Sequence, residues 1–273
     1  MPGLDPLLRA PAVLLLGEMH GTIESPAFTG RAVCLALAAG LPVTVALEIP
    51  LEEEPRIRAF LASSGSLADR ASLLGGAFWQ AEVQDGRSSQ AMLELLEALR
   101  RSARAGRPVH LVLLDSTAFA GGPNRDRAMA GRLHEAVVAA PHDFVIALTG
   151  NLHTRIKRGT PWNRVYEPMG FVLTQLVPGL AVNALDVAYT GGAAWFCDTP
   201  QPASCSAKAL KGSPDANGLR VTLFATPSAD GYNGTYSVGM LTASLPATSV
   251  PQPAGRPLSS SPRAPGPGRT SRR

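Results

Sequence analysis

The stretch Ala12-Val13-Leu14-Leu15-Leu16-Gly17-Glu18-Met19-His20-Gly21 decides the fold. Its first five residues are all apolar, a run that is typical of a short strand buried on both faces of a sheet. The two glycines allow a tight turn, and the residues at 18 and 20 project to the same side of an extended segment. The stretch therefore predicts a buried strand with a carboxylate and an imidazole at its carboxyl end.

Four more apolar runs follow, at residues 43–47, 109–114, 144–148 and 180–185. Segments with helical periodicity separate them, over residues 26–39, 125–139 and 169–176, and Ser25 is expected to cap the first of these helices. Parallel strands joined by helical crossovers form an α/β domain. We expect a mostly parallel central sheet with helices on both faces.

Two regions depart from this alternation. Residues 51–105 predict a helical, lid-like insertion after the second strand, with helices at 51–61, 67–74 and 88–105. After residue 190, short strands are predicted at 193–197, 219–225 and 236–242, as an antiparallel addition to the sheet or a small cap. We expect residues 1–248 to form a single α/β domain.

The net charge of +4 comes from the end of the chain. Residues 251–273 hold five arginines, six prolines and no acidic residue, whereas the preceding 250 residues hold 20 basic and 21 acidic side chains. Such a nearly neutral body lacks the electrostatic footprint of a nucleic-acid-binding domain. We expect residues 249–273 to be a disordered tail; a basic arm for an anionic partner is the alternative.

The chain contains no apolar run of about 18 residues, so no membrane-spanning helix is expected, and the N-terminus shows no export signal. Cys34 is expected to be buried as a small apolar side chain. Cys197 and Cys205 stand eight residues apart in a proline-containing loop. A disulfide there would imply an oxidising compartment, and two unrelated thiols are the alternative.

Polar side chains follow four of the predicted strands. Glu18 and His20 follow the first, Glu48 the second and Asp115 the third, and Asn151 and His153 follow the fourth. Ligands of open α/β sheets bind outside the carboxyl ends of the strands. Each acid alone could be a helix cap, but two of the five histidines lie in glycine-containing turns after strands, which favours a shared site.

Arg125 begins the helix that follows the third strand, so it is expected near the same edge of the sheet. There it could bind a substrate carboxylate, a phosphate or a developing oxyanion. The alternative is an ordinary salt bridge at the start of the helix, with Asp126 or Glu135.

Four motifs together resemble a known superfamily. They are Gly17-Glu18-Met19-His20-Gly21-Thr22-Ile23-Glu24, Leu47-Glu48, Arg125-Asp126-Arg127-Ala128-Met129-Ala130 and Gly150-Asn151-Leu152-His153. In that order they resemble the superfamily of erythromycin esterases, ChaN-like haem-binding proteins and Tiki-type metalloproteases, with the closest likeness to the bacterial ChaN-like branch. The resemblance spans about residues 12–190, with a weaker match at 234–244.

The resemblance implies that Glu18, His20, Glu48 and His153 form the site, with Arg125 and Asp126 supporting it; the positions of the other polar residues after the strands add the rest. The catalytic candidates are Glu18, His20, Glu48, Arg125 and His153, and the binding candidates are Glu24, Asp115, Asp126 and Asn151. By likeness to the esterases, His20 would be a general base that activates water without a metal. By likeness to the Tiki branch, His20, Glu48 and His153 would bind a divalent metal.

By likeness to ChaN, the protein would bind haem and need not hydrolyse anything. That branch ligates haem through a tyrosine, and the resemblance does not select among Tyr166, Tyr189, Tyr232 and Tyr236 for this role. No lipoprotein cysteine stands near the N-terminus. The resemblance favours an exported, periplasmic protein. We predict a hydrolase of ester, lactone or peptide bonds acting on a small molecule or peptide, with a haem-binding, iron-uptake protein as the alternative.

Overall fold

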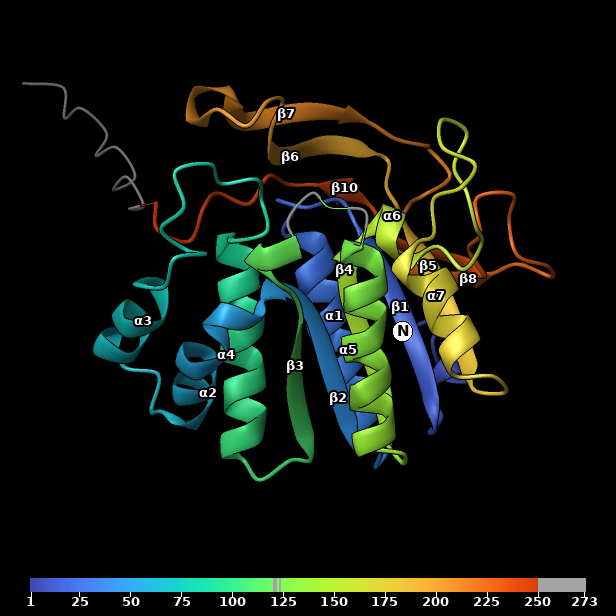
Figure 1. The fold of residues 1–273 in the computed structure, drawn as a ribbon, viewed down its shortest axis with the longest axis horizontal. Coiled ribbons are helices and arrows are strands. Elements are labelled where there is room, and N and C mark those ends of the chain that lie inside the picture. Colours follow the sequence, from blue (N-terminus) through green and yellow to red (C-terminus); the bar gives the residue numbers. More distant parts are fainter. Residues whose placement is uncertain (120–121, 123, 250–273) are drawn as a thin grey trace, which may run out of the picture.

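A computed structural model describes residues 1–119, 122 and 124–249 (Figure 1). Its main sheet has seven strands in the order β3-β2-β4-β1-β5-β9-β8. Their bounds are β1 (Ala12–Glu18), β2 (Val43–Pro50), β3 (Val109–Asp115), β4 (Phe144–Gly150), β5 (Ala181–Ala188), β8 (Leu219–Leu223) and β9 (Gly234–Val238). Every neighbouring pair is parallel except β8 and β9. The predicted mostly parallel sheet is confirmed.

Strand β4 lies between β1 and β2 although it follows both in the chain. Leu148 of β4 pairs with Leu16 of β1 on one side and with Leu47 of β2 on the other. The carboxyl ends of β3, β2, β4 and β1 therefore stand side by side at one edge of the sheet.

Helices cover both faces of the sheet, as predicted. Leu14 and Leu16 pack on one face with α1 (Glu24–Ala38) and α4 (Gln90–Arg104), whereas Val13 and Leu15 pack on the other with α5 (Arg125–Ala139) and α7 (Met169–Leu176). Figure 1 shows α5 and α7 in front of the strands and α1 behind them. Burial on both faces is why the run is apolar at every position.

Two predictions about α1 are wrong. Its N-cap is Ile23, which makes no side-chain cap, and Ser25 lies within the helix. The Ser25 hydroxyl instead accepts a hydrogen bond from Tyr236 at 3.1 Å. Cys34 is exposed, because it lies on the side of α1 that faces away from the sheet core.

The predicted helices of the insertion are confirmed. Residues 51–105 form η2 (Leu51–Glu53), α2 (Glu54–Ala62), α3 (Leu67–Leu74) and α4. Helix α4 buries Leu95, Leu96 and Leu99 against the sheet core, and α2 packs along α4. Short turns of helix occur at η1 (Asp5–Leu7), η3 (Thr117–Phe119), η4 (Pro202–Ser204) and α6 (Asn151–Thr154).

The C-terminal strands form both an addition to the main sheet and a small cap, the two alternatives expected for them. Strands β9 and β8 extend the main sheet, while β6 (Gly191–Cys197), β7 (Cys205–Lys211) and β10 (Met240–Leu241) form a separate small sheet. Strands β6 and β7 pair as an antiparallel hairpin, which we call the cap hairpin, above the carboxyl edge (Figure 1). Strand β7 was not predicted.

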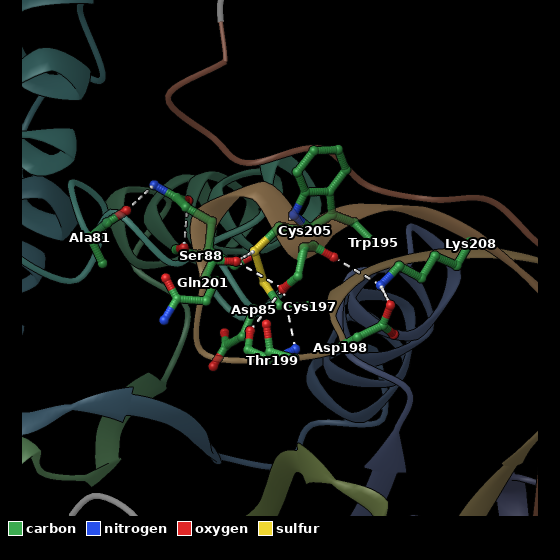
Figure 2. The surroundings of a disulfide bond; sticks show 12 residues. Ala81, Asp85, Ser88, Trp195, Cys197, Asp198, Thr199, Gln201, Cys205 and Lys208 are labelled. Atoms are coloured by element: carbon green, nitrogen blue, oxygen red, sulfur yellow. Dashed lines mark hydrogen bonds and ion pairs between the residues drawn. A yellow bond between two sulfur atoms is a disulfide. The ribbon is translucent and has the colours of Figure 1, made fainter.

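A disulfide joins Cys197 to Cys205 across the cap hairpin (Figure 2). The alternative of two free thiols is therefore wrong. Among the described residues no helix is long and apolar enough to cross a bilayer. The predicted tail lies outside the described residues, apart from Ser249.

Candidate active site

The carboxyl ends of four neighbouring strands bring the predicted site residues together. Glu18 and Asp115 are the last residues of β1 and β3, and Glu48 lies near the end of β2. Arg125 is the first residue of α5, and His153 lies on α6 directly after β4. The side chains lie at one edge because parallel strands end on the same side of a sheet.

His20 stands between two carboxylates. Its Nδ1 lies 2.8 Å from Oε1 of Glu18, and its Nε2 lies 3.4 Å from Oε2 of Glu48. The two carboxylates are almost fully buried, whereas 24% of the His20 side chain is exposed. The contact to Glu48 is long for a hydrogen bond, so Nε2 is the ring nitrogen that a substrate or a water molecule can approach.

These contacts determine the charges of His20 and Glu48. Burial lowers the pKa of His20, but the carboxylates of Glu48 and Glu18 outweigh it and raise that pKa to about 10. Burial raises the pKa of Glu48, but the positive charges of His20 and Arg125 more than compensate and hold it well below its usual range. At neutral pH the site therefore holds an imidazolium beside an ionised carboxylate.

Arg125 connects three residues of the cluster. Its Nε and Nη2 donate to the two carboxylate oxygens of Asp115 at 2.9 and 2.8 Å, a bidentate pair. Nη2 also donates to Oε1 of Glu48 at 2.5 Å, and Nη1 donates to Nε2 of His153 at 2.8 Å. The alternative of a helix-start salt bridge with Asp126 or Glu135 is therefore wrong.

His153 is oriented from its other ring nitrogen. Its Nδ1 lies 2.7 Å from Oδ1 of Asp126, and that oxygen also accepts from the backbone N–H of Met169 at 2.8 Å. The hydroxyl of Tyr166 donates to Oδ2 of Asp126 at 3.0 Å. Since a guanidinium can only donate, Nε2 of His153 must carry a lone pair and Nδ1 the proton.

Two residues of the cluster were not predicted. Arg87 donates from Nη1 to Asp115 at 2.7 Å and from Nε to Asp85 at 3.0 Å, and its Nη1 lies 3.6 Å from Glu48. Both Asp85 and Arg87 lie in the loop between α3 and α4, which has no strand or helix pattern. The Asp85-Gly86-Arg87 sequence reads only as a turn, so no signal placed it at the sheet edge.

A cavity of about 300 Å³ lies in front of His20, and we call it the catalytic cavity. It is lined by Glu18, Met19, His20, Asp85, Gly150, Asn151, Leu152, His153 and Phe196. Phe196 comes from the cap hairpin, so a strand far along the chain covers the site. Only Asp85 of the lid-like insertion lines this cavity.

The remaining binding candidates differ in whether they line the catalytic cavity. Asn151 lines the catalytic cavity and donates from Nδ2 to Asp186 at 3.3 Å. Asp115 and Asp126 hold Arg125 and His153 and do not line that cavity. Glu24 points elsewhere: its Oε2 accepts from the backbone N–H of Thr242 at 2.9 Å, which ties α1 to the segment after β10.

The predicted metal ligands His20, Glu48 and His153 do not fit the structure. The guanidinium of Arg125 contacts both His153 and Glu48, so a cation already occupies the space between two of the three predicted ligands. Across the described part of the chain, no group of three or more His, Cys, Asp or Glu side chains is arranged to hold a metal ion. His20, Glu48 and His153 are therefore not arranged as a metal centre.

His20 and His153 differ in what they could offer to a haem iron. Haem iron takes an imidazole nitrogen or a tyrosine hydroxyl; both ring nitrogens of His153 are in hydrogen bonds, whereas Nε2 of His20 has only its 3.4 Å contact to Glu48. Three tyrosine hydroxyls donate hydrogen bonds to other groups of the protein: Tyr166 to Asp126, Tyr232 to the Asn151 carbonyl and Tyr236 to the Gly17 carbonyl.

Comparison with known proteins supports the fold. No protein-family model and no curated protein sequence matches the chain. A mutant of erythromycin esterase EreC in its open conformation matches with a TM-score of 0.61 at 13% identity, covering 89% of this chain and 93% of that one. A succinoglycan biosynthesis protein matches with a TM-score of 0.62 at 9% identity, covering 89% and 91%.

A Bacillus cereus protein matches with a TM-score of 0.55 at 8% identity, covering 89% of this chain and 92% of its own. At such low identities the likeness establishes the fold alone. The chain therefore shares the fold of these three solved structures, one of which is an erythromycin esterase, and this agrees with the resemblance that its four ordered motifs predicted.

Proposed function

We propose that the protein is a hydrolase of ester, lactone or peptide bonds whose reaction centres on His20. The observation that carries the proposal is the position of His20: it stands between two almost fully buried carboxylates with 24% of its own side chain exposed, and it lines the catalytic cavity. Strongly perturbed groups in a cavity are candidates for acid and base catalysis.

The charge of His20 defines what it can do. With a pKa of about 10, only about one part in a thousand is neutral at pH 7. The reactive form can be described as a water molecule beside neutral His20 or as a hydroxide ion beside protonated His20. The two descriptions contain the same atoms and carry the same total charge. In either description His20 Nε2 carries the proton once the carbonyl has been attacked, and it then donates that proton to the leaving group.

Glu18 and Glu48 support this step differently. Glu18 accepts from Nδ1 of His20 and stabilises the imidazolium. Glu48 cannot turn freely, because it also accepts from the backbone N–H of Gly150 at 2.7 Å and from Arg125. Its long contact to Nε2 leaves that nitrogen available to a reacting atom.

We assign Arg125 the role of a positioning residue, in place of its expected role at an oxyanion. Four of its N–H groups are already used by Asp115, Glu48 and His153, and it does not line the catalytic cavity. His153, whose Nε2 lone pair is occupied by Arg125, is likewise held in place instead of being free to accept a proton.

The test is turnover of p-nitrophenyl esters, aromatic lactones and peptides by the wild type, His20→Asn and His142→Asn. His142 is an exposed histidine between α5 and β4, so its replacement is the matched control. We expect His20→Asn to lose at least a hundredfold in kcat/KM and His142→Asn to match the wild type. Unchanged activity in His20→Asn would refute the proposal.

The haem alternative has its own test, and it is separate from turnover. Hemin titration that gives a saturable Soret shift at one equivalent would support haem binding, whereas no spectral change at stoichiometric hemin rejects it.

A further inference from the structure

The segment between α6 and α7, residues 155–168, carries two exposed apolar residues, and we call it the Trp162 loop. Trp162 is 72% exposed and Val165 is 70% exposed. Among the large apolar residues that the structure describes, only Leu67 and Met240 are exposed to at least this degree, and they lie in separate elements. The loop therefore presents more apolar surface to solvent than a single exposed residue does.

Backbone hydrogen bonds hold both exposed residues in place. Thr160 and Asn163 exchange N–H···O bonds of 2.9 and 3.2 Å, and Trp162 lies in the turn between them. A second turn follows, in which the N–H of Tyr166 donates to the Asn163 carbonyl at 3.3 Å, and Val165 lies within it. Because the turns already fix the backbone here, a partner that covers these residues has little chain to order.

The other two tryptophans are packed into the protein. Trp79 is fully buried, and the indole N–H of Trp195 donates to the Gln84 carbonyl at 2.8 Å. Of the three, Trp162 alone is mostly exposed. An indole has an apolar body and one polar N–H, a combination that suits the boundary between hydrocarbon and water.

Basic residues flank the exposed tryptophan. Residues 155–166 hold four basic side chains and no acidic one. Lys157 and Arg164, on either side of Trp162 in the chain, are exposed, and neither forms an ion pair within residues 1–119, 122 and 124–249. Their uncompensated positive charges favour an anionic partner.

The Trp162 loop lies at the edge of the molecule that holds the candidate active site. Figure 1 shows this loop, in yellow-green, on the same side of the molecule as the cap hairpin. At the base of the loop, the hydroxyl of Tyr166 donates to Asp126, which orients His153. A surface that meets the loop therefore faces the carboxyl edge of the sheet.

We propose that the Trp162 loop docks the protein on the surface of an anionic lipid bilayer. Trp162 and Val165 enter the headgroup boundary, and Lys157 and Arg164 contact the lipid phosphates. Burial of apolar side chains and attraction to anionic lipids act together at such a surface. A single-stranded nucleic acid needs a basic groove with several stacking aromatic rings, whereas this loop offers one mostly exposed ring. The proposal does not depend on hydrolysis.

Flotation of the full chain with vesicles tests the docking without turnover. We expect binding to vesicles of equal parts phosphatidylcholine and phosphatidylglycerol to be at least tenfold stronger than binding to phosphatidylcholine alone, and to weaken at high salt. Trp162→Ser should lower the partition coefficient at least tenfold, whereas Trp162→Tyr should keep most of it. Leu67→Ser on α3, which removes an even more exposed side chain, is the matched control. Should Trp162→Ser fail to fold, Val165→Ser replaces it.

A second pair of variants tests the charges. Lys157→Gln/Arg164→Gln should lower binding to the anionic vesicles at least tenfold and leave binding to phosphatidylcholine unchanged. Arg104→Gln/Arg107→Gln removes two exposed charges just before β3, at the opposite edge of the sheet, and should bind like the wild type. Equal losses in the two double variants would overturn the proposal, because they would reflect net charge alone.

Other outcomes also overturn the docking. Vesicle binding that survives the loop variants would come from elsewhere, such as the five arginines of residues 251–273. Absence of vesicle binding by the wild type rejects the proposal directly. Tighter binding to a thymidine oligonucleotide than to the anionic vesicles, lost in the same loop variants, would identify a nucleic acid as the partner of the loop instead.

Discussion

Arg125 donates from Nη1 to Nε2 of His153 across 2.8 Å. A guanidinium has no lone pair to offer, so His153 is neutral, with its proton on Nδ1 toward Asp126. His20, held between Glu18 and Glu48, is an imidazolium instead. Two histidines of one cluster therefore differ in charge because one faces a cation and the other faces two anions.

Replacing Arg125 by Met should destabilise the fold by about 3–5 kcal/mol, because it leaves the buried carboxylates of Glu48 and Asp115 without their guanidinium. Urea denaturation measures the loss. Arg132→Met on the same helix removes an ion pair with Glu135 that is partly exposed and should cost less than about 1 kcal/mol. Similar losses in the two variants would contradict the buried network.

The rate of hydrolysis should rise with pH. Because the raised pKa of His20 lies at about 10, the reactive form increases about tenfold per pH unit between pH 6 and 9 and then levels off. A profile of kcat/KM against pH checks this. A plateau that begins near pH 7 would show that another group controls the proton.

Stability should fall at both ends of the pH range. The folded-state pKa of His20 is raised above 6.5 to about 10, so its stabilisation is complete below about pH 6.5 and is lost as pH rises toward 10. The pKa of Glu48 is held below its ordinary 4.5, so its stabilisation is present above that pH and is lost in acid.

The urea midpoint, measured from pH 3 to 10, checks both directions. His20→Asn should remove most of the decline between pH 6.5 and 10 while keeping the decline in acid. An alkaline decline of equal size in that variant would mean that other groups cause it.

Reducing the Cys197–Cys205 disulfide should loosen the cap hairpin. The bond closes a short loop, worth about 2–3 kcal/mol in the chain-entropy description. Next to it, Cys197 and the indole of Trp195 both contact the carbonyl of Gln84, the residue before Asp85. Reduction should therefore raise KM more than it lowers kcat, because it frees the strand that carries Phe196.

The measurement is steady-state kinetics of the wild type and of Cys197→Ser/Cys205→Ser, each with and without reductant. The double variant should have the KM of the reduced wild type and should not respond to reductant. Cys34→Ser is the control, since Cys34 is a free cysteine on α1. Unchanged KM in the double variant would separate the disulfide from the cavity.

Most of the sheet could be predicted from the sequence, because strands buried on both faces are apolar at every position. The same rule placed Glu18, Glu48, Asp115 and His153 correctly, since polar residues directly after such strands must lie at the carboxyl edge. The N-cap of α1 could not be predicted, because the hydroxyl of Ser25 is taken by Tyr236, more than 200 residues later in the chain.

Residues that reach the site from irregular segments escaped prediction for a different reason. Asp85 and Arg87 lie in a loop and Phe196 lies in the cap hairpin, and neither segment has a periodicity that indicates where it packs. Glu24 was placed at the site because it is the last residue of the first motif, but the helix that begins at this residue carries it away toward Thr242.

The position of β4 between β1 and β2 has a consequence for how the protein matures. During synthesis β1 and β2 emerge first, yet they never pair with each other, and the strand that joins them is made about a hundred residues later. Until β4 inserts, nothing aligns His20 with Glu48, because the backbone N–H of Gly150 that holds Glu48 is missing. Long-range parallel pairing is slow, so a nascent or refolding chain should acquire much of its helix before it acquires any activity.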